Sequence, residues 1–310
     1  MFSRKSRPAW AVLTLAALAL APTVAAASLA LETPAPGVYV HYGRHDVTTI
    51  DNRGDIANLG FIVGSRCVAV IDTGGSAAVG AALRAAIRRV TDKPVCYVIN
   101  THVHPDHVFG NAAFVDDRPQ FVGHARMPEA LARRGPHYLN ALRRDLGTAA
   151  DGTELVAPTL TVVGETRLDL GDRALTLRAW PTAHTDHDLT VFDEASATLF
   201  LGDLVFEGHL PVVDGNLRGM LAAIEELKRM PARLAIPGHG RAVRWPEVMD
   251  AQQRYLQRLL IEVKQAIAAK RTLAQAVETV GGDERDRWRL FDVFHRRNVA
   301  AAYAELEWDE

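Results

Sequence analysis

A dense group of metal-binding side chains directly after a buried strand is the feature that most constrains this chain. Residues 95–99 read Val-Cys-Tyr-Val-Ile, a short apolar run typical of a buried strand, and residues 101–107 then read Thr-His-Val-His-Pro-Asp-His. In the loop at the end of a strand, side chains close in sequence can converge on one point. We therefore expect the first two histidines to face one centre and the Asp-His pair to face a second centre beside it. The four predicted ligands are His102, His104, Asp106 and His107.

Three further residues are predicted to complete the two centres, because a zinc ion takes four or five ligands, one of them water at a catalytic site. Each lies at or beside the end of another apolar run. Taken singly, each has an ordinary explanation as a turn residue, a helix cap or a loop histidine, but together they supply what the first motif lacks. They are His184 in Ala-His-Thr-Asp, Asp203 in Leu-Gly-Asp and His239 in Pro-Gly-His-Gly.

Composition agrees with imidazole and carboxylate ligands and excludes several other classes of protein. The chain has 12 His but only 2 Cys, too few thiols for a cysteine-rich zinc or iron–sulfur module. Lys and Arg number 35 against 37 Asp and Glu, with no basic run, so we expect no nucleic-acid partner. A hydrophobic fraction of 48% with 23% charged residues excludes a disordered or fibrous chain.

The first 27 residues have the pattern of a secretory signal peptide. Arg4, Lys5 and Arg7 precede the uncharged run 9–21, and small residues follow up to Ala27, after which we predict cleavage. Because 13 largely apolar residues are too few to span a bilayer, we expect no stable membrane insertion after cleavage. The predicted location is therefore periplasmic or secreted.

The two cysteines can form a disulfide in this predicted compartment, because an oxidising space permits disulfides. Cys67 and Cys96 each lie five residues before the end of a predicted buried strand, at Asp72 and Thr101 respectively. If the two strands are neighbours the sulfur atoms can meet, but a bridge between parallel strands is geometrically awkward. The sequence leaves two interpretations open, one disulfide or two buried thiols.

The chain divides into two similar halves followed by a helical tail. Residues 67–99 predict a strand, a helix and a parallel strand, and residues 197–236 repeat this layout, with residues 151–190 between them predicted to form antiparallel strands. From residue 247 the apolar spacing is helical. We predict one compact domain over residues 28–245 and a helical extension over residues 246–310 that packs on it.

With all seven ligands in place, the chain resembles the metallo-β-lactamase superfamily over residues 36–245. The resemblance implies an α/β fold, a four-layer αββα sandwich with two sheets face to face and the metals at one edge. It also implies how the ligands divide between the metals: His102, His104 and His184 for the first, Asp106, His107 and His239 for the second, and Asp203 as the bridge.

A narrower resemblance links the chain to exported zinc metallohydrolases associated with quinoprotein dehydrogenases and bacterial sulfur oxidation. It rests on residues 58–64, 184–191, 211–215 and 295–299. It implies a function beside such a periplasmic dehydrogenase or sulfur-oxidation system, and it supplies neither a substrate nor an oligomeric state.

The chemistry that the resemblance implies is metal-dependent hydrolysis without a protein nucleophile. Two Zn²⁺ ions, or iron or manganese on the same nitrogen and oxygen ligands, lower the pKa of a shared water to about 7. The resulting hydroxide attacks an ester, thioester, lactone or amide-type small molecule, and Asp106 is the predicted catalytic residue that orients it.

Four other side chains are predicted near the site, either supporting a ligand or lining the cleft. Asp72 ends a predicted strand and is expected to support a ligand imidazole, since metal-bound histidines usually donate their second N–H to a carboxylate or carbonyl. His187 lies where the superfamily has a small residue, so it either lines the substrate cleft or faces the surface. His124 and His209 are predicted near the cleft.

Three alternative functions are weighed against the hydrolase. Residues 72–74 read Asp-Thr-Gly, as in aspartic proteases, but those enzymes need two such aspartates and the motif occurs once. A single-iron sulfur dioxygenase on the same fold would use the same kinds of ligand. A non-catalytic exported metal-binding protein would keep the pocket without turnover.

Overall fold

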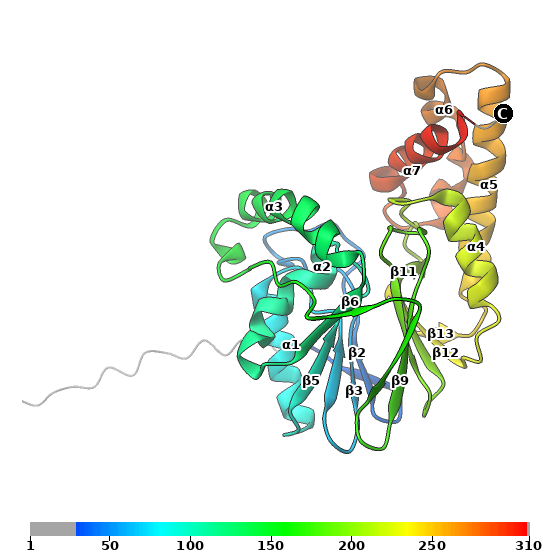
Figure 1. The fold of residues 1–310 in the computed structure, drawn as a ribbon. Coiled ribbons are helices and arrows are strands. Elements are labelled where there is room, and N and C mark those ends of the chain that lie inside the picture. Colours follow the sequence, from blue (N-terminus) through cyan, green and yellow to red (C-terminus); the bar gives the residue numbers. More distant parts are fainter. Residues whose placement is uncertain (1–28, 309–310) are drawn as a thin grey trace, which may run out of the picture.

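Two β-sheets face each other across an aliphatic core, and helices cover their outer faces (Figure 1). This computed structural model describes residues 29–308, so the predicted signal peptide lies outside the described residues. The core between the sheets contains the inward side chains of both, among them Ile62, Ile71, Leu177 and Phe200. The arrangement is the four-layer α/β sandwich expected from the resemblance, and that prediction is confirmed.

The strands of both sheets can be followed in order across the sandwich. The seven-stranded sheet consists of β1 (Glu32–Ala35), β2 (Val38–His41), β3 (Leu59–Val63), β4 (Val68–Ile71), β5 (Val95–Ile99), β6 (Gln120–His124) and β7 (Leu160–Val162). The six-stranded sheet consists of β13 (Val243–Arg244), β12 (Leu234–His239), β11 (Thr198–Phe206), β10 (Leu189–Asp193), β9 (Ala174–Ala179) and β8 (Glu165–Asp169).

Helices flank the two sheets on either side and extend beyond the second (Figure 1). The α-helices are α1 (Ala77–Val90), α2 (Pro105–Val108), α3 (Met127–Leu146), α4 (Leu217–Leu227), α5 (Met249–Ala268), α6 (Leu273–Thr279) and α7 (Phe291–Leu306). Three short 3₁₀ helices are η1 (Phe109–Asp117), η2 (Gly147–Ala150) and η3 (Gly282–Arg287). Within residues 29–308, none of the helices combines the length and the apolar character that crossing a membrane requires.

Each half of the molecule contains the parallel β-α-β unit expected from the sequence. Strands β4 and β5 pair in parallel and are connected by α1, and strands β11 and β12 pair in parallel and are connected by α4. Helix α1 begins where the Ser76 side chain accepts a hydrogen bond from the backbone N–H of Val79, and it buries Val79, Leu83 and Ile87 against β3 and β4. The carboxyl ends of both parallel pairs therefore lie at the same edge of the sandwich.

Three elements differ from the expectation. Helix α3 was not predicted; its sequence contains Pro136 and is rich in charged residues, although its apolar residues do recur on one face. Strand β7 pairs in parallel with β6, although the region from residue 151 was expected to be antiparallel throughout. Strand β11 does not end at Asp203 but continues to Phe206, with a register shift after Gly202.

Gly202 explains how β11 can pass the first ligand loop so closely. Its φ is 51°, in the left-handed region, and a Cβ at this position would lie 2.6 Å from the Cβ of Thr101. Only glycine fits this approach. The strand therefore brings the next residue, Asp203, beside the loop that follows β5.

Helices α5, α6 and α7 pack on one another and on the second sheet (Figure 1). Their buried polar contacts form one connected group, in which Tyr255 Oη donates to His295 Nδ1 at 3.0 Å and His295 Nε2 donates to the carbonyl of Val280 at 2.8 Å. The Asn298 amide donates to Tyr255 Oη at 3.1 Å. This network fixes α7 relative to α5.

The two cysteines form a disulfide. Cys67 precedes β4 and Cys96 lies in β5, with a Cα–Cα distance of 5.8 Å. Of the two interpretations left open by the sequence, the structure has the bridge. It joins the two parallel strands at the end opposite to the ligand loops.

We expect the disulfide to stabilise the native state by about 3.5 kcal/mol, because closing a loop between residues 29 positions apart restricts the unfolded chain. Urea unfolding with and without a reductant measures this difference. A Cys67→Ala/Cys96→Ala variant is the control, and its midpoint should not respond to the reductant. Equal midpoints for the oxidised and reduced wild type would contradict the prediction.

His41 is expected to give a pH-dependent contribution to stability. Burial opposes its charge, but hydrogen bonds to Asp55 Oδ1 at 2.7 Å and to the Ala30 carbonyl at 3.0 Å outweigh burial and raise its pKa. A raised histidine pKa stabilises the fold fully below the unfolded value near 6.5, and this is lost as pH rises through the folded pKa.

The His41→Gln variant should therefore be destabilised more at pH 6 than at pH 9, by about 1 kcal/mol. Urea unfolding of both proteins at the two pH values measures the difference. An equal loss of stability at both would show that the imidazolium form does not matter.

Candidate metal centre

All seven predicted ligands lie together at the edge of the sandwich where the parallel strands end. They form two groups, and within each group one ligand atom per residue lies within 4.8 Å of the others. The first group is His102, His104, His184 and Asp203; the second is Asp106, His107 and His239. The division follows the two metals that the resemblance implies, and metal binding itself stays a prediction.

Asp203 lies between the two groups. Its Oδ2 is 3.7 Å from His102 Nε2 and 3.5 Å from His184 Nε2. Its Oδ1 is 3.3 Å from His107 Nε2 and 3.5 Å from His239 Nε2. One carboxylate thus presents an oxygen to each group, which is the geometry that a bridging ligand requires.

The first three imidazoles turn their nitrogens towards one point. His104 Nδ1 lies 3.0 Å from His102 Nε2 and 3.0 Å from His184 Nε2. The opposite nitrogens are already engaged, His104 Nε2 with Asp214 Oδ2 at 3.1 Å and His184 Nδ1 with the Val212 carbonyl at 2.8 Å. Three converging nitrogens with their N–H groups directed outwards fit a cation at the point where they meet.

The second group shows the same orientation of its rings. His107 Nδ1 donates to Asp72 Oδ2 at 2.8 Å, and His239 Nδ1 donates to the Ile56 carbonyl at 2.9 Å. Among the described residues, His107 Nε2 and Asp203 Oδ1 are buried atoms without a hydrogen-bond partner. Because a buried polar atom left without a partner is costly, these atoms fit metal ligation.

The pKa values in the site reflect burial and mutual charge. Burial, and after it the neighbouring His107, lowers the pKa of His102 well below its usual value, and burial lowers the pKa of His184 to about 4. Burial works against ionised Asp203, but the positive fields of His239 and His107 hold its pKa well below the usual value. Neutral imidazoles and an ionised carboxylate are the forms that bind metals.

The second group has a surplus of negative charge. Burial would lower the pKa of His107, but the carboxylates of Asp203, Asp106 and Asp72 outweigh it and raise the pKa well above its usual value. The pKa of His239 is also raised, because Asp203 and Asp106 outweigh burial. Three carboxylates around two imidazoles create a field that favours a cation here.

Asp72 holds the ligand loop from the neighbouring strand, as expected for a supporting residue. It follows β4 with a φ of 55°, a left-handed conformation that Asp tolerates better than most residues. Its Oδ1 accepts the backbone N–H of Thr101 at 2.8 Å, and its Oδ2 accepts the Thr101 hydroxyl at 2.8 Å as well as His107 Nδ1. One carboxylate therefore fixes both ends of the loop.

His187 is buried and supports the loop from the second sheet. Its Nε2 accepts the backbone N–H of Val103, between two ligands, at 3.2 Å, and its Nδ1 is paired with Asp186. Burial lowers its pKa to about 4, which keeps Nε2 an acceptor. Its side chain neither lines the cavity nor reaches the surface, and it has the supporting position that was predicted as the alternative to the cleft.

His209 and His124 differ in their relation to the site. His209 is buried in the wall of the cavity beside the ligands, where its ring lies 4.9 Å from that of His239 between centroids. His124 is buried elsewhere, with its Nδ1 accepting the backbone N–H of Arg126 at 2.9 Å, and it is absent from the cavity lining.

Residues 211–214 and Asn298 were not assigned roles from the sequence, yet they hold two of the ligands. The Val212 carbonyl accepts from His184 and the Asp214 carboxylate from His104, as described above. Asn298 of α7 holds this segment by donating to the Pro211 carbonyl at 2.6 Å and accepting the Val213 N–H at 2.9 Å. Residues 211–215 and 295–299, two of the segments that carried the narrower resemblance, therefore contact each other. Their presence in that resemblance was the one sequence signal that pointed to these residues.

A cavity of about 270 Å³ opens onto both groups of ligands. Its walls come from the loop before β3, from α3, from the segment after β11 and from α7. The cavity is lined by Asp46, Val47, Thr48, Ile56, His104, Pro105, Asp106, Tyr138, His184, Asp203, Phe206, His209, Val212, His239, Phe294 and Arg297. A small molecule that enters it meets the predicted metals directly.

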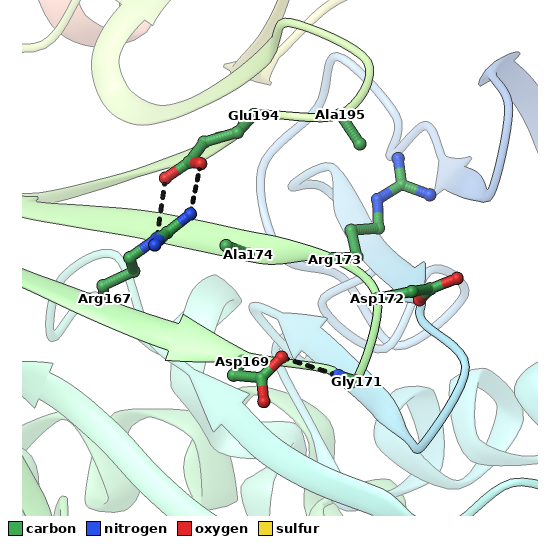
Figure 2. A pocket seen from close by; sticks show the side chains of 8 residues that line it. All are labelled: Arg167, Asp169, Gly171, Asp172, Arg173, Ala174, Glu194 and Ala195. Carbon is green, nitrogen blue, oxygen red and sulfur yellow. Dashed lines mark hydrogen bonds and ion pairs between the residues drawn. The ribbon is translucent and has the colours of Figure 1, made fainter.

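A larger hollow of about 580 Å³ lies at the β8–β9 hairpin, and none of the predicted ligands lines it (Figure 2). Arg167 makes two hydrogen bonds to Glu194, at 3.1 and 2.7 Å, and the Asp169 carboxylate accepts the Gly171 N–H at 2.8 Å. Because these polar groups pair with one another, the hollow is a surface feature rather than a candidate site.

Comparison with known proteins places this geometry in a family. Residues 52–239 match the family model described as the metallo-beta-lactamase superfamily. The structure of a metallo-beta-lactamase from Pontibacter korlensis matches with a TM-score of 0.61 and 19% identity, covering 74% of this chain and 99% of that one.

Two alkylsulfatases also match, one in structure over most of the chain and one in sequence over a short part of it. The structure of a stereoselective inverting sec-alkylsulfatase from Pseudomonas sp. has a TM-score of 0.69 at 19% identity and covers 91% of this chain, which spans about half (51%) of that protein. A curated linear primary-alkylsulfatase from Pseudomonas sp. is 36% identical over 58 residues, which are 19% of this chain and 11% of that protein.

Replacing Asp72 by Asn should weaken metal binding by about 10- to 100-fold, because the amide no longer offers His107 a charged acceptor. Competition with a chromogenic chelator measures the affinity. Asp169→Asn, which changes an exposed carboxylate on β8, is the control. Equal affinity of the two variants, with both folded by circular dichroism, would show that Asp72 does not support the site.

Proposed function

Because the chain belongs to the metallo-beta-lactamase superfamily, we propose that it is an exported binuclear zinc hydrolase of a small-molecule ester, thioester, lactone or amide. Family and fold identify it as a metal-dependent hydrolase; the metals, the substrate and the compartment belong to the proposal. The observation that carries it is the convergence of seven donor side chains in two groups with Asp203 between them.

The donor set favours zinc, with iron or manganese as the alternatives that use the same ligands. His102, His104 and His184 would hold one ion, Asp106, His107 and His239 the other, and Asp203 both. Bound here, the pair of ions supplies a water whose pKa is about 7 instead of 15.7, and hence a nucleophile at neutral pH.

The chain's own residues position the reactants. Asp106 Oδ2 lies 3.4 Å from His239 Nε2 and its side chain borders the cavity, so we assign to it the orientation of the attacking water through a hydrogen bond. The buried imidazoles and the apolar cavity walls limit access of bulk water, which strengthens electrostatic interactions with the reacting group.

Export is supported by two features of the chain. The pattern of residues 1–27 is that of a secretory signal, and the Cys67–Cys96 disulfide suits an oxidising compartment. A periplasmic or secreted hydrolase of this kind would act beside a quinoprotein dehydrogenase or a sulfur-oxidation system, as the narrower resemblance implies.

Hydrolysis of sulfuric esters is a second candidate activity. It is favoured by the 36% identity to a linear primary-alkylsulfatase over 58 residues and by the similarity in fold to a sec-alkylsulfatase over 91% of this chain. Hydrolysis of a sulfuric ester, like that of a carboxylic ester, adds the elements of water across a bond to oxygen and releases an alcohol and an acid anion, so a sulfuric ester belongs in the substrate panel.

Metal analysis and the Asp106→Asn variant test the proposal together. The purified wild type should contain about two zinc ions per chain and hydrolyse at least one member of a panel of esters, thioesters, lactones, β-lactams and alkyl sulfates. Asp106→Asn should lower the rate by 10²-fold or more while leaving the circular dichroism spectrum unchanged.

The possible outcomes separate the alternatives. One iron per chain would favour oxygen chemistry of the sulfur-dioxygenase type, and two metals with no turnover would favour a metal-binding protein. Less than one metal ion per chain would contradict the proposed metal centre. Turnover at the wild-type rate by the Asp106→Asn variant would contradict the proposed mechanism.

A further inference from the structure

Helix α7, from the tail of the chain, forms one wall of the cavity that opens onto the predicted metals. It contributes Phe294 and Arg297, which lie one turn apart on the helix. The Phe294 ring contacts His209 in a tilted arrangement, with ring centroids 5.3 Å apart, and the Phe206 ring stacks on His209, also at 5.3 Å. The deeper wall is therefore aromatic.

Aliphatic side chains extend this apolar surface around the cavity. Val47 and Ile56 come from the loop before β3, and Val212 comes from the segment that α7 holds. Val47 remains 39% exposed although it lines the cavity. A substrate without an apolar group would leave this surface in contact with water, so the lining favours a hydrophobic substituent.

Arg297 is the cation that α7 adds to this wall. Its guanidinium is paired with Asp214 Oδ1, while Arg134 Nη1 donates to Asp214 Oδ2 at 2.6 Å and His104 Nε2 lies 3.1 Å from the same oxygen. Two guanidinium groups therefore share a single carboxylate. Among these three charged side chains the positive charges exceed the negative charge by one, beside His104 of the first group of ligands.

The guanidinium of Arg297 has donors to spare for an additional anion. Its side chain is 54% exposed, and a guanidinium carries five N–H donors, whereas one contact to Asp214 uses only part of them. Three carboxylates line the same cavity, and two of them, Asp106 and Asp203, belong to the predicted metal ligands. The third, Asp46, is exposed, and its Oδ1 accepts the N–H of Val47 at 2.8 Å. Asp46 is thus committed to its own loop.

We infer that the substrate of this site is an amphiphilic anion, with an apolar group that packs on Phe294 and its neighbours and a negatively charged group that Arg297 binds. The inference rests on the proposed function in one respect, that the cavity is the substrate site. It assigns to α7 a role in specificity: neutral molecules of the same size should bind more weakly than anions.

Arg296 provides a matched control on the same helix. It is a neighbouring arginine, 63% exposed and paired with Glu278 at 2.7 Å, and it does not line the cavity. Arg296→Met and Arg297→Met remove the same charge from the same element. A difference between the two variants therefore reports the position of the charge and not the net charge of the protein.

Binding of non-reactive probes tests the inference without any need for turnover. The probes are octanoate, octanamide and acetate, titrated calorimetrically into the metal-loaded protein. Octanoate should bind at least tenfold more tightly than octanamide, which lacks the charge, or acetate, which lacks the chain. Arg297→Met should weaken octanoate binding about tenfold, leave octanamide binding unchanged, and be partly rescued by Arg297→Lys.

The remaining variants complete the experiment. Phe294→Ala should weaken octanoate and octanamide alike, and Arg296→Met should change neither; metal content is measured for every variant, so that a loss of metal is not mistaken for a loss of the anion site. Equal binding of octanoate and octanamide, or equal effects of Arg296→Met and Arg297→Met, would overturn the inference. Arg297-dependent binding without hydrolysis of any panel substrate would instead leave the inference standing and contradict the proposed function.

Discussion

Five imidazole rings and two carboxylates share one buried space, and the surrounding structure is arranged to keep their metal-binding atoms directed inwards. At such short distances these groups would repel one another or lack hydrogen-bond partners, unless the outer nitrogen of each ring has a fixed hydrogen-bond acceptor. The partners are diverse: a carboxylate for His107, backbone carbonyls for His184 and His239, and Asp214 for His104. A cation bound between them would further offset the cost of burying so many polar groups.

The sandwich brings these groups together by the way its two halves are oriented. In each half, a strand, a helix and a parallel strand carry polar residues to the carboxyl end of the pair. Because the two sheets face each other, both carboxyl ends lie at one edge. Residues more than 130 positions apart, such as His107 and His239, therefore become neighbours, with ring centroids 5.6 Å apart. The glycine at position 202 allows the closest part of this approach, between β11 and the loop after β5.

The fold and the ligand positions were predictable because their signals are local. The motif at residues 102–107 carries its own chemistry, and the apolar runs that precede the ligands are short and continuous. The position of Asp203 was predicted, but its strand was expected to end there, since a run of apolar residues does not reveal a strand that continues past a register shift. Helix α3 was missed although its apolar residues recur at helical spacing, because an internal proline and a high content of charged residues argue against a buried helix.

The roles of Asp214, Arg297 and Asn298 could not be predicted from the sequence, because each depends on a contact between distant segments. Asp214 and His104 are separated by 110 positions, and Asn298 and Val213 by 85. The polar residue types at these positions are common in loops and helices and have no distinctive spacing. Only the packing of α7 against residues 211–214 gives them a function.

The contact between Asn298 and that segment has a thermodynamic consequence. The same few residues accept hydrogen bonds from the predicted ligands on one side and are held by α7 on the other. The coupling free energy between ordering of the ligands and docking of α7 is reciprocal. If docking of α7 favours the ordered ligands, then a cation bound by the ligands favours docking of α7 by the same free energy. Binding of a metal and docking of α7, which share no direct bond, would therefore strengthen each other through residues 211–214, and the chain's tail would act as a remote part of the coordination site.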